Sequence, residues 1–305
     1  MIAGIYAFNG AFLADLATTE SRIGQTNRQI SSGIRVNQAS DDPTAVAPII
    51  AYGGEITQIQ QVQSNLDSAG TEATAADGAL QAASTLIDQL TTIAAQGSNS
   101  DMTASSRSSL GTQVQQIEQQ LVGLANTQVA GRFIFGGDAS SVAPYTYNWT
   151  ATGATTANSP GVTTEVLRDT GGNEIVPRMT AQQIFDAQSG GVPAPGNVFQ
   201  TVYSLGQALL TNNQAAVQSA AVSLKACVTQ LGQATTFYGN AENWIKQAGD
   251  QATEKLTTLQ QALSSVRDTD LASAATQLSL EQVALNAAVS AHGSLNTKSL
   301  FDYIG

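Results

Sequence analysis

The amino-acid sequence predicts a mainly α protein: an elongated coiled-coil helical bundle formed by the N- and C-terminal segments, with a small β-rich domain inserted in the middle. Two patterns carry this prediction. Apolar residues recur at alternating spacings of three and four over residues 59–94 and again over 224–266, as in packed helices. Residues 131–200 instead carry turn residues and short strand-like runs. Long helices from both sides of the insertion are therefore expected to pack together.

The first helix is expected within residues 11–32. Ile23, Ile30 and Ile34 lie on an approximate helical stripe, and Gly33 is a natural C-cap because glycine readily adopts the left-handed conformation that ends many helices. Helices of modest length need a tertiary partner to be stable in water. The C-terminal segment is expected to supply that partner.

A short acidic loop follows this helix. Asp41 and Asp42 could be read as paired catalytic carboxylates, but Asp42-Pro43 also provides an N-cap acceptor followed by proline at the first helical position. Capping is the favoured interpretation. Arg35 is expected either to pair with such an acid, across the loop or across a subunit boundary, or to be a solvated surface charge.

The longest seam begins at residue 59 and runs over five heptads. Its positions are Ile59, Val62, Leu66, Ala69, Ala73, Ala76, Leu80, Ala83, Ile87, Leu90 and Ala94. Residues 97–101, GSNSD, end this helix with glycine and polar turn residues. A second helix then continues the seam as an antiparallel neighbour, because the connection is short. Its positions are Leu110, Val114, Ile117, Leu121, Leu124 and Gln128, with Gly131 at its end.

A third helix is expected over residues 224–266, on the far side of the insertion. Its seam contains Leu224, Val228, Leu231, Thr235, Tyr238, Glu242, Ile245, Gly249, Ala252, Leu256, Leu259, Leu263 and Val266. The register breaks at residues 267–270, which indicates a hinge or subdomain boundary. A fresh seam follows at Leu271, Ala275, Leu278, Gln282, Leu285, Val289 and His292.

The inserted segment reads as turns and hairpins. RFIFGGD, residues 132–138, has a short aromatic strand pattern before a Gly-Gly turn, and TTEVLRDTGGNEIV, residues 163–176, reads as strand, glycine-rich turn and strand. Three domains are therefore predicted. They are a terminal coiled-coil assembly domain of residues 1–40 plus 267–305, a helical bundle domain of 41–130 plus 200–266, and an outer β-rich insertion domain of 131–199.

Composition excludes several classes of partner. The net charge is −11, from 12 Lys and Arg against 23 Asp and Glu, so no basic face is expected for nucleic acid or for anionic lipid. No apolar run approaches the roughly 18 residues of a membrane span. The start, MIAGIYAFNGAFLADL, lacks the features of a cleaved secretory signal, so export would need another route.

Side chains that carry chemistry are scarce. Cys227 is the only cysteine and His292 the only histidine, which leaves no thiolate cluster and no imidazole pair for a metal. Cys227 is read as a small buried hydrophobe, with a reactive thiol as the alternative. Asn148-Trp149-Thr150 formally fits a glycosylation acceptor, a weak match. No catalytic residue, metal site or cofactor is expected, and the protein is predicted not to be an enzyme.

Both flanks of the chain carry a resemblance. QISSGIRVNQASDDPTAVAPI, residues 29–49, resembles the N-terminal signature of the flagellin superfamily, with a helix ending in Ser-Ser-Gly, a basic residue and an Asp-Asp loop. Residues 266–305, VRDTDLASAATQLSLEQVALNAAVSAHGSLNTKSLFDYIG, are similar to the matching terminal region. The resemblance implies a structural subunit of the bacterial flagellum. The His-Glu-x-x-His motif of metallopeptidase-bearing relatives is absent.

Within that superfamily, the segment AGRFIFGGDASSVAPY at residues 130–145 and the stretch SLFDYIG at 299–305 look like the members that form the junction between hook and filament. A junction adaptor assembled through its terminal helices is therefore the leading functional hypothesis. The alternative is a short flagellin that forms the filament itself. An extracellular enzyme is a third hypothesis, which the terminal motifs disfavour.

The resemblance also implies partners and a location. The implied partners are other copies of this chain, the neighbouring hook-associated protein, flagellin and a flagellar export chaperone. The implied location is the extracellular flagellum, which the chain would reach through the flagellar secretion system without a cleaved signal peptide. Assembly energy is expected from residues near the two ends of the chain. The predicted interface comprises Ile23, Ile30, Arg35, Leu271, Leu278, Leu285, Leu300, Phe301 and Tyr303.

Overall fold

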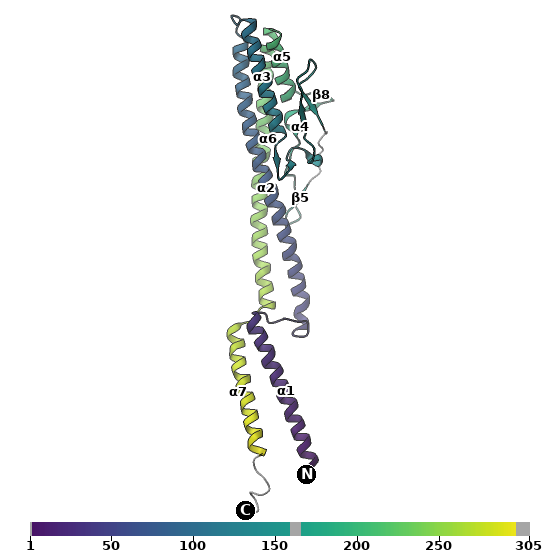
Figure 1. The fold of residues 1–305 in the computed structure, drawn as a ribbon, viewed down its shortest axis with the longest axis vertical. Helices are drawn as coiled ribbons and strands as arrows, with labels where there is room; N and C mark the ends of the chain where they lie inside the picture. Colours follow the sequence, from purple (N-terminus) through teal and green to yellow (C-terminus); the bar gives the residue numbers. More distant parts are fainter. Residues whose placement is uncertain (1, 159–165, 297–305) are drawn as a thin grey trace, which may run out of the picture. The chain divides into compact units, whose positions relative to one another are not determined.

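A computed structural model describes residues 2–158 and 166–296, and the fold is mainly α with only small two-stranded sheets, as predicted. Figure 1 shows the helices and the short strands. The helices in the described ranges are α1 (Ile2–Ser32), α2 (Pro43–Gly97), α3 (Ala104–Ala125), α4 (Ala181–Phe185), α5 (Val198–Leu210), α6 (Gln214–Arg267) and α7 (Leu271–Asn296).

The chain divides into two compact units. Residues 1–58 and 255–305 form the terminal unit, and residues 59–254 form the central unit. Helices α2 and α6 each contribute residues to both. The three-domain division drawn from the sequence is finer than this, and it stays a prediction.

The apolar seam of α2 runs through the hydrophobic core of the central unit. Of the predicted seam positions, Val62 is partly buried and the other ten are buried, which confirms the heptad reading. Its alanines belong to one hydrophobic core with larger side chains of other elements, among them Phe185, Leu205, Leu231 and Tyr238. Small residues on one helix and bulky residues elsewhere fill a core without voids.

Helices α3 and α5 approach closely because each carries a glycine at the contact (Figure 1). A Cβ atom on Gly111 of α3 would lie 2.8 Å from Cγ of Leu210. One on Gly206 of α5 would lie 2.5 Å from Cη2 of Trp149 and 3.3 Å from Cγ1 of Val114. Both positions therefore depend on the missing side chain. Helix α5 was not predicted from the sequence, although its N-cap is present: Oδ1 of Asn197 accepts the Gln200 N–H at 2.9 Å.

The second helix ends earlier than the sequence predicted. Helix α3 stops at Ala125, and Gln128 lies instead in β1 (Gln128–Val129), which pairs with β2 (Arg132–Phe133). Asn126 redirects the chain, because its side chain donates to the Tyr145 carbonyl at 2.7 Å and accepts the Tyr145 N–H at 3.0 Å. Gly131, at φ +78°, therefore belongs to a hairpin turn and not to a helix end.

The insertion consists of short antiparallel hairpins. In the described ranges four two-stranded sheets occur. Besides β1–β2 they pair β3 (Tyr145–Tyr147) with β4 (Thr155–Ala157), β5 (Leu167–Arg168) with β6 (Glu174–Ile175), and β7 (Gln188–Ser189) with β8 (Val192–Pro193). The β5–β6 pair confirms the predicted hairpin, with Gly172 at φ +84° in its turn.

In the terminal unit, α1 packs against α7. The predicted C-cap is confirmed, since Gly33 has φ +70° and its N–H donates to the Gln29 carbonyl at 2.9 Å. The predicted register break is confirmed as well: α6 ends at Arg267, and Asp270 caps α7 by accepting the Ala272 N–H at 3.0 Å. A backbone hydrogen bond of 2.9 Å from Thr269 N–H to the Gly33 carbonyl joins the two turns.

Candidate functional site

The turn that follows α1 is fixed by charged side chains. The Arg35 guanidinium contacts the Asp42 carboxylate at 2.9 Å and donates to the Val266 carbonyl at 2.7 Å, in the last turn of α6. A cation at a helix C-terminus donates hydrogen bonds to the last carbonyl groups and interacts favourably with the negative end of the helix dipole. Of the sequence alternatives for Arg35, pairing across the loop within one chain is therefore the one the structure contains.

Asp42 caps α2, and Asp41 fixes the turn that precedes it. Asp42 Oδ1 accepts the Thr44 N–H at 3.1 Å and the Ala45 N–H at 3.3 Å, with Pro43 as the first residue of α2. A side-chain hydrogen bond from Thr44, followed by one from Arg35, lowers the pKa of Asp42 to about 2. Asp41 Oδ2 accepts the Asn37 and Gln38 N–H groups at 3.0 Å each. The predicted capping role of Asp42 is confirmed.

Replacing Arg35 by alanine should loosen this turn. The variant loses the contact with Asp42 and the hydrogen bond to the α6 terminus, so amide exchange at residues 37–45 should accelerate by about three- to tenfold, the size expected for a half-exposed charged interaction. Hydrogen–deuterium exchange with mass spectrometry measures this. Arg22→Ala on the exposed face of α1 is the control, and an equal acceleration in both variants would contradict a specific role for Arg35.

Polar contacts also hold α1 to α7. The Thr26 hydroxyl donates to Glu281 Oε2 at 3.2 Å, and Nε2 of His292 lies 3.1 Å from Oδ1 of Asn9. The His292 ring stacks on Phe12 with the ring centroids 4.0 Å apart. The imidazole therefore packs within the helix pair.

The two terminal helices leave apolar side chains exposed. On α7 the less exposed stripe is Ala274, Leu278, Glu281, Leu285 and His292. It keeps Leu278, Leu285 and His292 of the predicted seam, whereas the other four predicted positions, Leu271, Ala275, Gln282 and Val289, are exposed. Over residues 9–32 and 271–294, the exposed large apolar side chains are Leu13, Leu271, Leu280, Val283 and Val289, which we call the apolar terminal surface. A helix that is apolar on all sides is one that will be buried. Helix α7 therefore has more apolar surface than α1 covers.

Arg35 lies in the turn described above, and the other eight predicted interface residues fall into three groups. Leu271 lies on the apolar terminal surface, 53% exposed, whereas Ile23, Ile30, Leu278 and Leu285 are half-buried in the helix pair. Leu300, Phe301 and Tyr303 lie outside the described residues. The sequence reading missed Leu13, Leu280 and Val283, because it looked for a single seam on each helix. The signal that could have found them is the apolar character of α7 all round.

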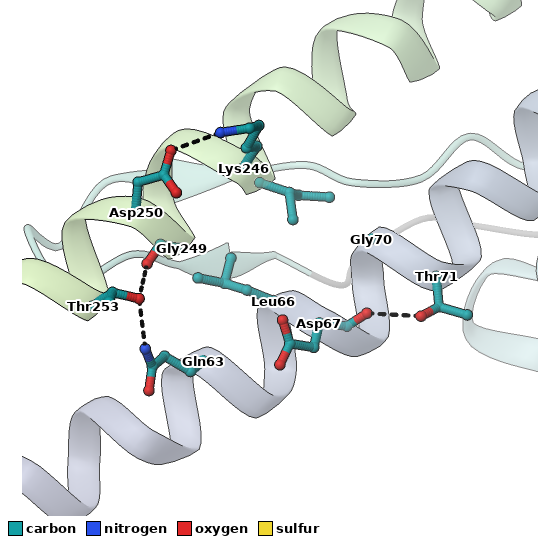
Figure 2. Close-up of a pocket in the computed structure, with 10 residues that line it drawn as sticks. Gln63, Leu66, Asp67, Gly70, Thr71, Lys246, Gly249, Asp250 and Thr253 are labelled. Atoms are coloured by element: carbon teal, nitrogen blue, oxygen red, sulfur yellow. Dashed lines mark hydrogen bonds and ion pairs between the residues drawn. The ribbon is translucent and has the colours of Figure 1, made fainter. Parts of the chain in front are cut away.

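A groove of about 630 Å³ lies between α2 and α6 in the central unit. Figure 2 shows polar side chains from both helices around it. Gln63 Nε2 donates to Thr253 Oγ1 at 3.0 Å across the groove, while Lys246 pairs with Asp250 at 2.9 Å along α6. The first contact links the two helices, and the second stays on α6. The groove is a widening of the helix pair, where Gly70 and Gly249 carry no side chain.

Reactive groups in the described ranges are either buried or dispersed. Cys227 is buried, donates its S–H to the Asn197 carbonyl at 3.8 Å, and has its pKa raised by burial, which confirms the hydrophobe reading. Over residues 2–158 and 166–296, no set of three His, Cys, Asp or Glu side chains could hold a metal ion. No helix in the same ranges is long and apolar enough to cross a membrane.

Comparison with known proteins gives one consistent result. Residues 7–140 match the family model described as the bacterial flagellin N-terminal helical region. The chain is 27% identical over 184 residues to flagellar hook-associated protein 3 of Salmonella typhimurium, covering 60% of this chain and 56% of that protein. It is 28% identical over 115 residues to a flagellin of Clostridium tyrobutyricum, covering 38% and 30%.

Among solved structures, a putative flagellar hook-associated protein from Vibrio parahaemolyticus superposes with a TM-score of 0.64 at 22% identity, covering 75% of this chain and 100% of that one. At this identity the likeness concerns the fold. The matched stretches span less than two thirds of the length of the curated relatives named above.

Proposed function

We propose that this chain is a member of the flagellin superfamily and a structural subunit of the junction between the hook and the filament, because residues 7–140 match the flagellin N-terminal model and the chain is similar to flagellar hook-associated protein 3. Assembly runs through its terminal helices. Residues 1–40 and 267–305 form the proposed assembly domain, and residues 131–199 form the proposed outer domain. The protein acts by packing and not by catalysis.

The observation that supports this proposal is the apolar terminal surface. Leu280 and Val283 are 66% and 63% exposed, and they lie on the side of α7 away from the stripe that meets α1. Leaving a large aliphatic side chain in water forgoes about 1.5–3 kcal/mol relative to full burial. Neighbouring copies that cover this surface recover that free energy, and copies related by one repeated head-to-tail operation build a ring or a helical tube.

A short flagellin is the second candidate, and the match to a clostridial flagellin supports it. The match to hook-associated protein 3 covers a larger share of the chain, 60% against 38%, which favours the junction. The proposed partners follow from the junction role. They are further copies of this chain, the neighbouring hook-associated protein, flagellin, and an export chaperone that shields the apolar C-terminal helix before secretion.

Immunogold electron microscopy of intact flagella tests the location. The label is directed to the proposed outer domain. Gold confined to the boundary between hook and filament is the expected result, in an extracellular position reached through the flagellar secretion system. Gold along the whole filament would replace the junction proposal by the flagellin candidate, and flagella without gold would reject both.

Removal of residues 299–305 is expected to abolish incorporation into the flagellum while the central unit stays folded. The segment contains Leu300, Phe301 and Tyr303, whose apolar surface is proposed to join the assembly interface. Incorporation is measured by recovery of the variant in purified flagella, and folding by the thermal transition of the central unit. Undiminished incorporation would show that the interface lies elsewhere in the chain.

A further inference from the structure

The β5–β6 hairpin and helix α6 enclose a second groove in the central unit, which we call the tryptophan groove. Its volume is about 280 Å³. It is lined by Asp169, Asn173, Glu174, Ile175, Trp244, Gln247, Ala248 and Gln251. This size suits a small ligand, at the lower end of the range for binding pockets.

One wall is a helix face with an exposed aromatic ring. Trp244 is 56% exposed, although indole is among the side chains that gain most from burial. Gln247 and Gln251 follow at spacings of three and four, so they share the face of α6 that carries Trp244. Among the described residues neither glutamine amide makes a hydrogen bond, which leaves donors and acceptors available beside the ring.

The opposite wall is a hairpin whose charges are already engaged. Asp169 Oδ1 accepts the Gly171 and Asn173 N–H groups at 2.8 Å each, and Asp169 Oδ2 accepts the Asn173 side-chain N–H at 2.8 Å. Glu174 pairs with Arg168 at 2.8 Å. These contacts hold the wall in one conformation. Three N–H donors therefore already occupy the Asp169 oxygens, and Arg168 already pairs with Glu174.

We infer that the tryptophan groove binds a neutral saccharide ring. A pyranose has an apolar face that stacks on an indole and a rim of hydroxyls that both donate and accept hydrogen bonds. The groove offers the matching features: the Trp244 ring, the amides of Gln247 and Gln251, and the buried aliphatic side chain of Ile175. An anionic ligand is disfavoured, since two carboxylates line the groove. This site is independent of the assembly surface.

The test uses the full chain and a panel of neutral oligosaccharides: maltotriose, cellotriose, lactose and chitotriose. Binding is followed by the emission of Trp244 in a Trp149→Phe variant, and by calorimetry with the unmodified chain. At least one sugar should bind with a Kd of about 1 mM. Trp244→Ala should weaken that binding by about tenfold or more, and Gln247→Ala by about threefold.

Trp149→Phe is also the matched control, since Trp149 lies outside the groove and contacts Tyr203 with the ring centroids 5.1 Å apart. It should keep the affinity of the unmodified chain in calorimetry. The inference is overturned if no sugar of the panel binds, or if Trp244→Ala binds as tightly as the unmodified chain. It is equally overturned if a trilysine peptide occupies the groove and the sugars do not, because the groove would then recognise cations.

Discussion

Urea unfolding of the central unit should become progressively easier as the pH rises from about 4.5 to about 8, and Glu118→Gln should abolish that dependence. Glu118 lies on α3, and its side chain is fully buried. Neither carboxylate oxygen has a hydrogen-bond partner among the described residues. Burial therefore raises the pKa of Glu118 from 4.5 to about 8.

The sign follows from which state holds the proton. Between the two pKa values the folded protein keeps Glu118 protonated while the unfolded chain releases the proton, so each rise in pH favours unfolding. The expected slope is about 1.4 kcal/mol per pH unit, or roughly 5 kcal/mol over the interval. Stability from this group is fully present below pH 4.5 and is lost by the time the pH passes 8.

Tryptophan fluorescence is the suitable probe, because Trp149 and Trp244 both lie in the central unit. Glu118→Gln removes the titration, and Glu118→Met also removes the buried polar atoms, so it should be the more stable of the two. Asp88→Asn, an exposed carboxylate on α2, is the control and should keep the slope of the unmodified chain. A slope unchanged in Glu118→Gln would assign the pH dependence to another group.

The long helices were predictable because the spacing of their apolar residues is a local pattern that repeats many times. The apolar positions of α2 alternate at spacings of three and four over residues 59–94, and an insertion elsewhere in the chain does not disturb that pattern. Cap signals were equally local. Asp42-Pro43 and Gly33 act where the sequence placed them, since a cap depends on the conformation of a few neighbouring residues.

Features set by tertiary contacts could not be predicted in the same way. Helix α3 ends at Ala125 because Asn126 pairs with Tyr145, a residue nineteen positions further along the chain. Helix α5 carries Gly206, which lowers helix propensity but fits against Val114 of α3. Neither contact is visible in the local pattern, so the sequence reading extended α3 too far and omitted α5.

Only part of the proposed assembly surface on the terminal helices was predictable, for a related reason. Apolar spacing identifies which residues a helix can bury, but it does not divide them between an internal partner and an external one. On α7, Leu278 and Leu285 occupy the stripe toward α1, whereas Leu280 and Val283 stay exposed. That division depends on how α1 is rotated against α7, which only the packed pair reveals.

Arg178→Met should destabilise the central unit by about 3–5 kcal/mol, as expected when one partner of a buried ion pair is removed. Arg178 forms an ion pair with Glu72 of α2, and the two side chains are each only 11% exposed. The next residue, Met179, donates its N–H to the Tyr238 hydroxyl of α6 at 3.1 Å. Residues 178 and 179 therefore connect the insertion to both α2 and α6. In the Arg178→Met variant the Glu72 carboxylate would stay buried without this partner.

A double-mutant cycle separates the ion pair from the packing. Glu72→Met combined with Arg178→Met leaves no unpaired charge, so its free energy of unfolding should return to within about 1 kcal/mol of the unmodified chain. Arg168→Met is the matched control, because Arg168 of β5 pairs with Glu174 of β6 but its side chain is 73% exposed. This variant should have the same free energy of unfolding as the unmodified chain. Additive losses in the double variant would mean that the aliphatic contacts, and not the charge pair, anchor the insertion.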